Sequence, residues 1–182
     1  MKIAITGHTS GIGKCLYDLL VAEGHEVIGF SRSNGYDLAV PATVGNIVKQ
    51  VKDCDVFINN AYYNLAQVDL MYALDVFWKD NKSKTHIVIG SRSADGIFFK
   101  ASPYAVMKSA IDNAALQLQV ASRYRLINVK PGYTNTPMTT GPNSKVKNVP
   151  NSLIEPEDLA EFIIQLIKHT KFKVLNVTID PI

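Results

Sequence analysis

Near its N-terminus the chain reads Lys2-Ile3-Ala4-Ile5-Thr6-Gly7-His8-Thr9-Ser10-Gly11-Ile12-Gly13. The apolar, β-branched beginning of this stretch predicts a buried strand that ends at Gly7. The apolar residues then recur with the three- and four-residue spacing of a helix face: Ile12, Cys15, Leu16, Leu19 and Leu20. Gly24 ends that helix. A strand, a glycine-rich turn and a helix therefore follow one another directly.

Outward from this unit, segments of strand length alternate with segments of helical period. The expected further strands are 26–30, a stub at 36–38, 55–58, 86–90, 126–130 and 173–179. The expected further helices are 41–51, 65–79, 103–123 and 155–167. This alternation predicts an α/β fold, with a doubly wound parallel β-sheet flanked by helices on both faces. No linker or repeat divides the chain, so we expect residues 1–182 to form a single domain.

The composition excludes several classes of protein. The 182 residues are 47% hydrophobic and 19% charged, with 19 Lys and Arg against 16 Asp and Glu. The basic residues are scattered, so we expect no nucleic-acid partner. Cys15 and Cys54 lie far apart outside any Cys/His cluster, which predicts core thiols, a reducing compartment and no metal site. The N-terminus lacks a signal-peptide core, and no apolar run reaches the roughly 18 residues of a membrane span. We therefore expect a cytoplasmic protein with no membrane partner.

Residues 138–154 show no periodicity and are rich in Thr, Asn, Pro and Lys. A loop of this length is uncommon in a compact domain and often carries function, so it is a candidate lid over a substrate. Its polar and basic side chains favour a polar or anionic substrate, although an ordinary solvated loop has the same composition.

The glycine pattern after the first strand is typical of a phosphate-binding turn. Glycine permits a tight turn and a close approach of backbone to a pyrophosphate, and the N–H groups at the helix start attract its charge. We therefore expect a Rossmann-type, NAD(P)-binding domain; a glycine-rich packing turn without a ligand is the alternative. It is not a Walker loop, because Cys15 follows Lys14 where Ser or Thr is needed. The candidate cofactor residues here are Gly7, Thr9, Ser10, Gly11, Ile12 and Gly13.

The residues that follow the second expected strand favour NADP(H) over NAD(H). NAD-binding proteins place a carboxylate there, whereas this chain has Ser31-Arg32-Ser33. No negative charge repels a 2′-phosphate, and the Arg32 guanidinium can bind one with two hydrogen bonds. An ordinary surface arginine is the alternative. Asp37, with Leu38 beside it, then falls where a side chain could meet the adenine amine, although a turn aspartate is also common.

Tyr104 and Lys108 lie four residues apart on one face of the expected helix 103–123. Chance alone supplies roughly 0.7 such Tyr-Lys pairs in this composition, so the pair needs support from its surroundings. A phenol with an ordinary pKa near 10 becomes a useful acid–base group at neutral pH when a cation stabilises its phenolate. Ser91, directly after the strand 86–90, could hydrogen-bond a substrate oxygen. Ser93 competes for the same role.

With these residues in place, the sequence resembles the short-chain dehydrogenase/reductase family through nearly its whole length. Asn59-Asn60-Ala61 matches the family's Asn-Asn-Ala-Gly, and Ser91 precedes Tyr104 by the usual 13 residues. The stretch 131–138 resembles the family's segment after the sixth strand, where Thr136 would hold the nicotinamide carboxamide. The resemblance implies further cofactor contacts from Asn59, Asn60, Ala61, Tyr104, Lys108, Pro131, Gly132, Thr134 and Thr136.

The resemblance also implies a catalytic tetrad of Asn64, Ser91, Tyr104 and Lys108, in which Asn64 would anchor a water relay to the lysine. Tyr62 stands where the family has its fourth glycine. Most of the helix between the second and third strands is missing, and the C-terminal end at Ile182 lacks the family's glycine-rich tail. Because this trimming affects helices through which relatives oligomerise, assembly as a homodimer or a homotetramer stays open.

These features together predict an NADPH-dependent reductase, or the reverse dehydrogenase, that acts on a small-molecule carbonyl or alcohol. Tyr104 would donate the proton, Ser91 would steady the carbonyl oxygen, and Lys108 would lower the pKa of the tyrosine and bind the nicotinamide ribose. A non-catalytic dinucleotide-binding redox sensor is one alternative. A sugar-nucleotide epimerase or dehydratase is another, although such enzymes need a larger C-terminal domain than this chain has room for.

Overall fold

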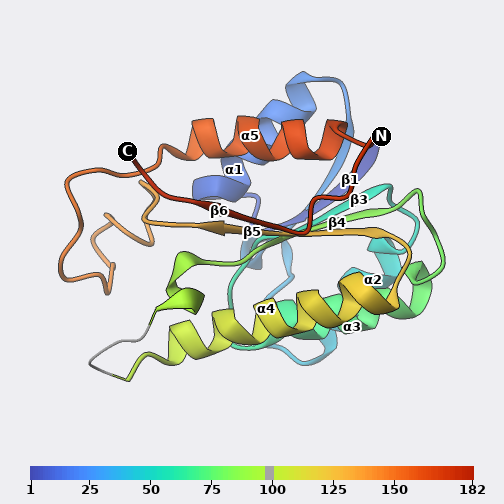
Figure 1. The fold of residues 1–182 in the computed structure, drawn as a ribbon, viewed down its shortest axis with the longest axis horizontal. Coiled ribbons are helices and arrows are strands. Elements are labelled where there is room, and N and C mark those ends of the chain that lie inside the picture. Colours follow the sequence, from blue (N-terminus) through green and yellow to red (C-terminus); the bar gives the residue numbers. More distant parts are fainter. Residues whose placement is uncertain (97–100) are drawn as a thin grey trace.

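A computed structural model describes residues 1–96 and 101–182 of the chain. In this part of the chain a parallel sheet of six strands has the order β2-β1-β3-β4-β5-β6 (Figure 1). The strands are β1 (Lys2–Thr6), β2 (Glu26–Phe30), β3 (Val56–Asn59), β4 (Thr85–Ile89), β5 (Arg125–Pro131) and β6 (Asn176–Ile179). The helices are α1 (Gly11–Ala22), α2 (Ala42–Val51), α3 (Ala66–Trp78), α4 (Pro103–Ala121) and α5 (Pro156–Lys168), with 3₁₀ turns η1 (Arg32–Asn34) and η2 (Arg92–Asp95).

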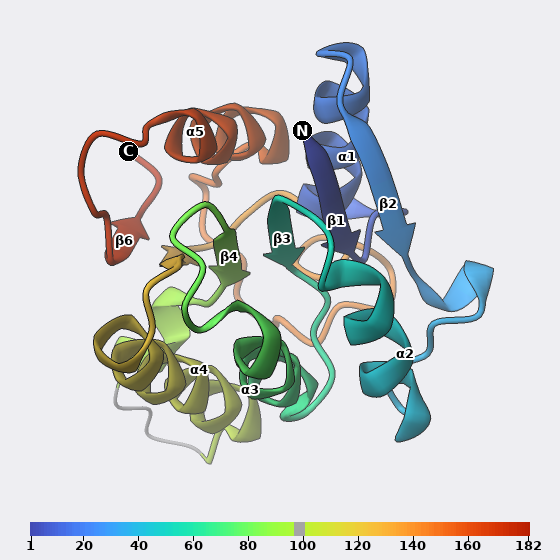
Figure 2. The ribbon, with the colours of Figure 1, turned by 90° about the vertical axis from the view of Figure 1, so that its right-hand side faces the viewer.

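Helices cover both faces of the sheet. Figure 2 shows α1 and α5 on one side and α2, α3 and α4 on the other. The strands alternate their side chains between the two layers: Ala4 belongs to the cluster under α2 to α4, whereas Ile3 and Ile5 belong to the cluster under α1 and α5. Burial on both faces is why the strands are apolar along their length rather than at every second residue. The predicted doubly wound α/β fold is confirmed.

The strand order brings the polar segments that follow the strands to one edge of the sheet. Since every pairing is parallel, the carboxyl ends of all strands meet at one edge of the sheet. β1 has β2 on one side and β3 on the other, so the chain reverses its direction of travel across the sheet at β1. Ligands of open α/β sheets bind at such a point.

Two of the expected strands differ in the structure. Residues 36–38 form no strand; the Tyr36 ring instead packs edge-on against Phe30, with centroids 4.7 Å apart, and Leu38 joins the cluster under α2. These apolar side chains gain burial without strand pairing. The last strand begins at Asn176 rather than at residue 173.

The two cysteines differ in their surroundings. Cys54 is buried, as predicted, but the prediction that Cys15 is a core thiol is wrong. Cys15 is only partly buried and its Sγ donates a hydrogen bond to Glu157 Oε1 at 3.3 Å, because its position on α1 faces the start of α5. Burial and the nearby carboxylate raise the pKa of this thiol to about 11. Cys15 is therefore protonated at neutral pH.

The remaining segments of the described chain are the irregular stretch 138–154 and the elements that follow it. None of the helices within residues 1–96 and 101–182 is both long and apolar enough to cross a bilayer. Residues 138–154 form turns and irregular backbone, as expected, and Ile154 forms an isolated parallel bridge with Thr134. The segment after them forms α5 and β6 of the same sheet.

Trp78 closes the core at the end of α3. Its side chain is 1% exposed, its Nε1 donates to the Lys52 carbonyl at 2.8 Å, and its ring packs edge-on against Tyr124 and His86. Burial raises the pKa of Tyr124 and lowers that of His86 to about 3, so both rings in this cluster are uncharged.

We expect Trp78→Ala to lower the free energy of unfolding by about 3–5 kcal/mol, because it leaves a large cavity and an unpaired carbonyl. The matched control is Phe77→Ala at the neighbouring residue, which is 56% exposed and should change stability by no more than about 0.5 kcal/mol. Urea unfolding followed by far-UV circular dichroism measures both. Equal losses for the two variants would contradict the assignment of Trp78 to the core.

Candidate active site

The turn after β1 is built around two glycines that touch. Gly7 has a φ of +74°, and a Cβ atom on Gly13 would lie 2.1 Å from the Gly7 carbonyl oxygen. Only glycine at both positions lets α1 start this close to the end of β1. In the described structure the side chain of Ser10, the residue before α1, caps none of the helix N–H groups. The first turn of α1 thus presents free donors to a negatively charged ligand.

Neighbouring segments fix this turn in place. Thr6 Oγ1 accepts hydrogen bonds from the backbone N–H groups of Asn60 and Ala61 at 2.9 and 3.0 Å, and Asn60 Nδ2 donates to the Thr6 carbonyl at 3.0 Å. A Cβ atom on Gly11 would lie 3.1 Å from Thr136 Cγ2, so the segment after β5 lies against the helix start. These contacts bring predicted cofactor residues from β1, β3 and β5 together.

A cavity of about 810 Å³ opens beside this turn at the ends of β1 and β2. Its lining includes the predicted cofactor residues Gly7, Thr9, Ser10, Ser31, Arg32, Asp37, Leu38 and Ala61. Arg32 is exposed, whereas Ser31 is buried and forms a capping box with Asn34. The Asp37 carboxylate accepts the Ala39 backbone N–H at 3.0 Å, as in an ordinary aspartate turn. The basic side chain on this wall is therefore available to a ligand.

Tyr104 and Lys108 lie together at the start of α4, close to the carboxyl ends of β3 and β4. The helix begins with Ser102 Oγ accepting from the Ala105 N–H at 3.3 Å and with Pro103 in its first turn. Lys108 Nζ lies 5.7 Å from the centroid of the Tyr104 ring. Burial raises the pKa of the Tyr104 phenol above its ordinary value of 10, and the nearby Ser91 side chain opposes that rise.

The Lys108 amine is sequestered. The residue is 2% exposed, and Nζ donates to Gln67 Oε1 and to the Ile89 carbonyl, both at 2.8 Å. Burial lowers its pKa to about 7, while the charge of Asp112 acts in the opposite direction. The amine is therefore close to half protonated at neutral pH, which suits a group that takes part in proton movement.

Sequence reasoning missed Gln67. It is fully buried on α3, and its Nε2 donates to the carbonyls of Asn59 and Ile89 at 2.9 and 3.1 Å. Asn59 Nδ2 in turn donates to the Gln67 carbonyl at 2.8 Å. Gln67 precedes Leu70, Met71 and Leu74 by three, four and seven residues, and a polar residue on such an apolar helix face was the signal that could have found it, because a buried amide needs partners.

The structure does not bring Asn64, the predicted fourth member of the tetrad, to Lys108. Asn64 is exposed and precedes α3 in a left-handed conformation with a φ of +43°. It occupies the turn that starts the helix, where asparagine tolerates positive φ better than most residues. The amide that contacts Lys108 belongs to Gln67, three residues further along.

Ser91 lies directly beyond β4, and its position is set by the turn η2. Its Oγ accepts the Ser93 N–H at 3.1 Å, and the side chain is 7% exposed. Ser91 is thus the serine that reaches Tyr104, while Ser93 contributes its backbone to the turn. The local geometry favours Ser91 over Ser93 for contact with a reacting oxygen.

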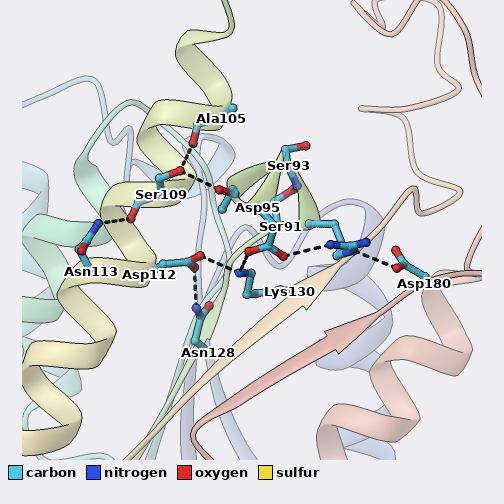
Figure 3. Close-up of polar contacts among 12 residues, drawn as sticks. Ser91, Ser93, Asp95, Ala105, Ser109, Asp112, Asn113, Asn128, Lys130 and Asp180 are labelled. Atoms are coloured by element: carbon cyan, nitrogen blue, oxygen red, sulfur yellow. Dashed lines mark hydrogen bonds and ion pairs between the residues drawn. The ribbon is translucent and has the colours of Figure 1, made fainter. Parts of the chain in front are cut away.

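A charged network holds η2 against its surroundings (Figure 3). Lys130, 7% exposed on β5, pairs with Asp95 of η2 and with Asp112 of α4, the latter at 2.7 Å. Arg92 joins Asp95 at 3.2 Å and Asp180 after β6 at 2.9 Å. The network links the turn that carries Ser91 to the helix that carries Tyr104 and Lys108. A lysine inside a strand expected to be buried, at 126–130, was the available sequence signal, and it was missed.

The remaining predicted residues lie beyond the end of β5. A Cβ atom on Gly132 would lie 2.7 Å from Asp180 Oδ1, so this position has no room for a side chain. Thr134 is buried and its Oγ1 donates to the Gly132 carbonyl at 3.2 Å. Pro131 ends β5 itself. Among the described residues no group of three or more His, Cys, Asp and Glu side chains is arranged to hold a metal ion.

Comparison with known proteins gave structural matches only. No family model matches the sequence, and no curated protein matches it. Solved structures match along nearly the whole chain, among them many short-chain dehydrogenases/reductases. The chain has the short-chain dehydrogenase/reductase fold. At 16–22% identity among the structures with the strongest matches, this likeness establishes the fold and leaves the chemistry to be argued from the site.

Three of these structures illustrate the match. An alcohol dehydrogenase from the archaeon Thermococcus sibiricus, complexed with 5-hydroxy-NADP, has a TM-score of 0.77 and 19% identity over 98% of this chain and 96% of its own. A short-chain dehydrogenase from Burkholderia cenocepacia in complex with NADP has a TM-score of 0.78 and 20% identity over 97% and 86%. A 3-alpha-hydroxysteroid dehydrogenase from Pseudomonas sp. B-0831 complexed with NADH has a TM-score of 0.77 and 22% identity over 99% and 95%.

The buried Lys108 amine makes a testable contribution to pH-dependent stability. Above about pH 7 the folded protein has released this proton, whereas the unfolded chain keeps it up to about pH 10.5. In that window the unfolded state binds more protons, so Lys108 makes the unfolding free energy rise with pH. We expect the stability of the wild type, relative to Lys108→Met, to increase steadily from pH 7 to pH 9.5.

Urea unfolding of both proteins at several pH values measures this difference. Lys82→Met, at an exposed turn position, is the matched control and should run parallel to the wild type. Parallel curves for Lys108→Met as well would show that the amine keeps an ordinary pKa in the folded protein.

Proposed function

We propose that this chain is an NADP(H)-dependent oxidoreductase of the short-chain dehydrogenase/reductase type, which transfers hydride between nicotinamide and a small carbonyl or alcohol substrate. The observation that carries the proposal is the cluster of Ser91, Tyr104 and Lys108 at the carboxyl edge of the sheet. This cluster lies next to a cavity whose shape and donors suit a dinucleotide.

The turn after β1 supports dinucleotide binding. The space at Gly13 is too small for any Cβ atom, and the uncapped start of α1 offers N–H donors to a pyrophosphate. The cavity of about 810 Å³ extends from this turn to Arg32 and Asp37, where an adenosine would lie. Gly7, Ser10 and Gly11 would hold the phosphates.

The preference for NADP(H) rests on Arg32. Its guanidinium lines the cavity, and no carboxylate stands at 31–33 to repel a 2′-phosphate. A charge-assisted pair with two hydrogen bonds is the interaction that arginine forms best with phosphate. The Thermococcus and Burkholderia structures contain 5-hydroxy-NADP and NADP, whereas the Pseudomonas structure contains NADH, so the fold itself accommodates both cofactors.

Tyr104, Ser91 and Lys108 would have different roles in the proton transfer. When bound, the nicotinamide supplies or accepts the hydride. Because burial raises its pKa, the Tyr104 phenol is protonated at neutral pH and is ready to give its proton to a carbonyl oxygen in the reductive direction. Ser91 donates a hydrogen bond to the same oxygen as negative charge develops on it. When protonated, Lys108 would stabilise the phenolate that remains, and it would hold the nicotinamide ribose.

A non-catalytic dinucleotide-binding sensor is the second candidate, because the aromatic ring of Tyr62 lies directly over the Lys108 amine. The two candidates share the cofactor site and differ in turnover. Titration of the cofactor tests the shared part, and substitution of Tyr104 separates the two.

We expect Arg32→Glu to weaken NADPH binding by roughly tenfold to a hundredfold, since it exchanges a charge-assisted pair for repulsion. NADH binding should change by less than about threefold. The measurement is a titration followed by the fluorescence of the reduced nicotinamide. Lys82→Glu, an equal charge reversal at an exposed position, controls for the change in net charge. Equal losses for NADPH and NADH would contradict a 2′-phosphate site at Arg32.

We expect Tyr104→Phe to lower kcat for carbonyl reduction by roughly 10²- to 10⁴-fold, because it removes the general acid and keeps the ring. NADPH affinity should be nearly unchanged. A panel of ketones and aldehydes assayed by NADPH oxidation provides the activity, and Tyr63→Phe at the exposed neighbour of Tyr62 is the control. If the wild type binds NADPH tightly and turns over none of the panel, the result favours the non-catalytic sensor over the reductase.

A further inference from the structure

Tyr62 stands between the cofactor cavity and the acid–base pair. The residue lines the cavity together with Ala61 and Tyr63. On its other side its ring packs edge-on against Tyr104, with centroids 4.9 Å apart and an interplanar angle of 73°. Lys108 Nζ lies 5.4 Å from the Tyr62 ring centroid. Within the described structure Tyr104 and Lys108 do not line the cavity, so Tyr62 forms the partition.

This partition also closes the open side of the Lys108 amine. An ammonium has three N–H donors, and two of them serve Gln67 Oε1 and the Ile89 carbonyl. The other groups that the described structure places over this amine are the rings of Tyr62 and Tyr104. A ligand hydroxyl that approaches Lys108 from the cavity therefore meets the Tyr62 ring first.

The contacts that hold the Tyr62 ring are weak enough for the ring to change its position. Tyr62 is partly exposed and lies in the irregular segment between β3 and α3. No hydrogen bond of its hydroxyl is found among the described residues, so the specific contacts that a rotation of the ring gives up are the aromatic pair and the cation–π contact. Contacts of these two kinds together correspond to roughly a tenfold bias toward the closed position.

We propose that Tyr62 is a movable positioning residue that separates the adenosine half of the site from its catalytic half. The inference rests on the proposed function. With the ring in place, the cavity accepts the adenosine and phosphate part of a dinucleotide. The nicotinamide part reaches Tyr104 and Lys108 only when the ring turns away. The whole dinucleotide therefore binds with an affinity reduced by the fraction of molecules that are open.

The test compares two probes, NADPH and 2′-phospho-ADP, which lacks both the nicotinamide and its ribose. Isothermal titration calorimetry gives both affinities for the wild type, Tyr62→Ala, Tyr62→Phe and Tyr63→Ala. We expect Tyr62→Ala to bind NADPH roughly tenfold more tightly, with the affinity for 2′-phospho-ADP changed by less than about twofold. Tyr62→Phe keeps the ring and should behave as the wild type. Tyr63 lines the same cavity and is 43% exposed, so Tyr63→Ala controls for loss of a neighbouring ring.

The outcomes separate this inference from the proposed function. If 2′-phospho-ADP binds but the Tyr62→Ala variant gains nothing for NADPH, or loses affinity for it, the partition is overturned and the cofactor site stands. If neither probe binds to the wild type or to the variant, the proposed function fails and the partition with it. Tyr62→Leu, which removes the ring but keeps an apolar side chain, replaces Tyr62→Ala if thermal unfolding shows that the alanine variant is not folded.

Discussion

The contact between Gly13 and the carbonyl of Gly7 is the constraint on which the site depends. It sets α1 directly against the end of β1, and the N–H groups of that helix therefore point at the edge of the sheet where the cavity opens. The bonds from Asn60 and Ala61 to Thr6 then fix the end of β3 beside the same turn. Any larger residue at Gly13 would force the helix away from the strand, and the phosphate donors would move with it.

A second constraint is the burial of two lysines, Lys108 and Lys130. The two differ in the partners of the amine and therefore in its pKa. Lys108 is buried, which lowers its pKa to about 7, and its amine donates to the neutral acceptors of Gln67 and Ile89. Lys130 has the two carboxylates of Asp95 and Asp112, which raise its pKa against the opposing effect of burial. The first arrangement leaves an amine able to gain or lose a proton, while the second gives a fixed charge that anchors η2. The contrast distinguishes a lysine suited to chemistry from one that supports it.

The repeated alternation of apolar segments was sufficient to predict the fold, because burial on both faces leaves a clear pattern in the sequence. Tyr104, Lys108, Ser91 and the glycine turn could be proposed from the sequence because their spacing is local. Gln67 was missed because its role depends on how α3 packs against α4, and the Asn64 prediction followed from counting along a motif across a shortened segment. The strand expected at 36–38 is absent since Tyr36 and Leu38 bury themselves against Phe30 and α2, and sequence periodicity does not distinguish these two ways of becoming buried.

The strand order determines which part of the site is synthesised first. Every described residue that lines the cavity beside the turn after β1 lies between Thr6 and Tyr63, and the three strands β1, β2 and β3 are neighbours in the sheet. A chain that leaves the ribosome N-terminus first has therefore made the complete lining of that cavity before Ser91, Tyr104 or Lys108 has been synthesised. Substitutions in the later segments can alter the reaction while the lining itself stays unchanged. The residues that line the cavity are therefore synthesised before the residues of the Ser91, Tyr104 and Lys108 cluster.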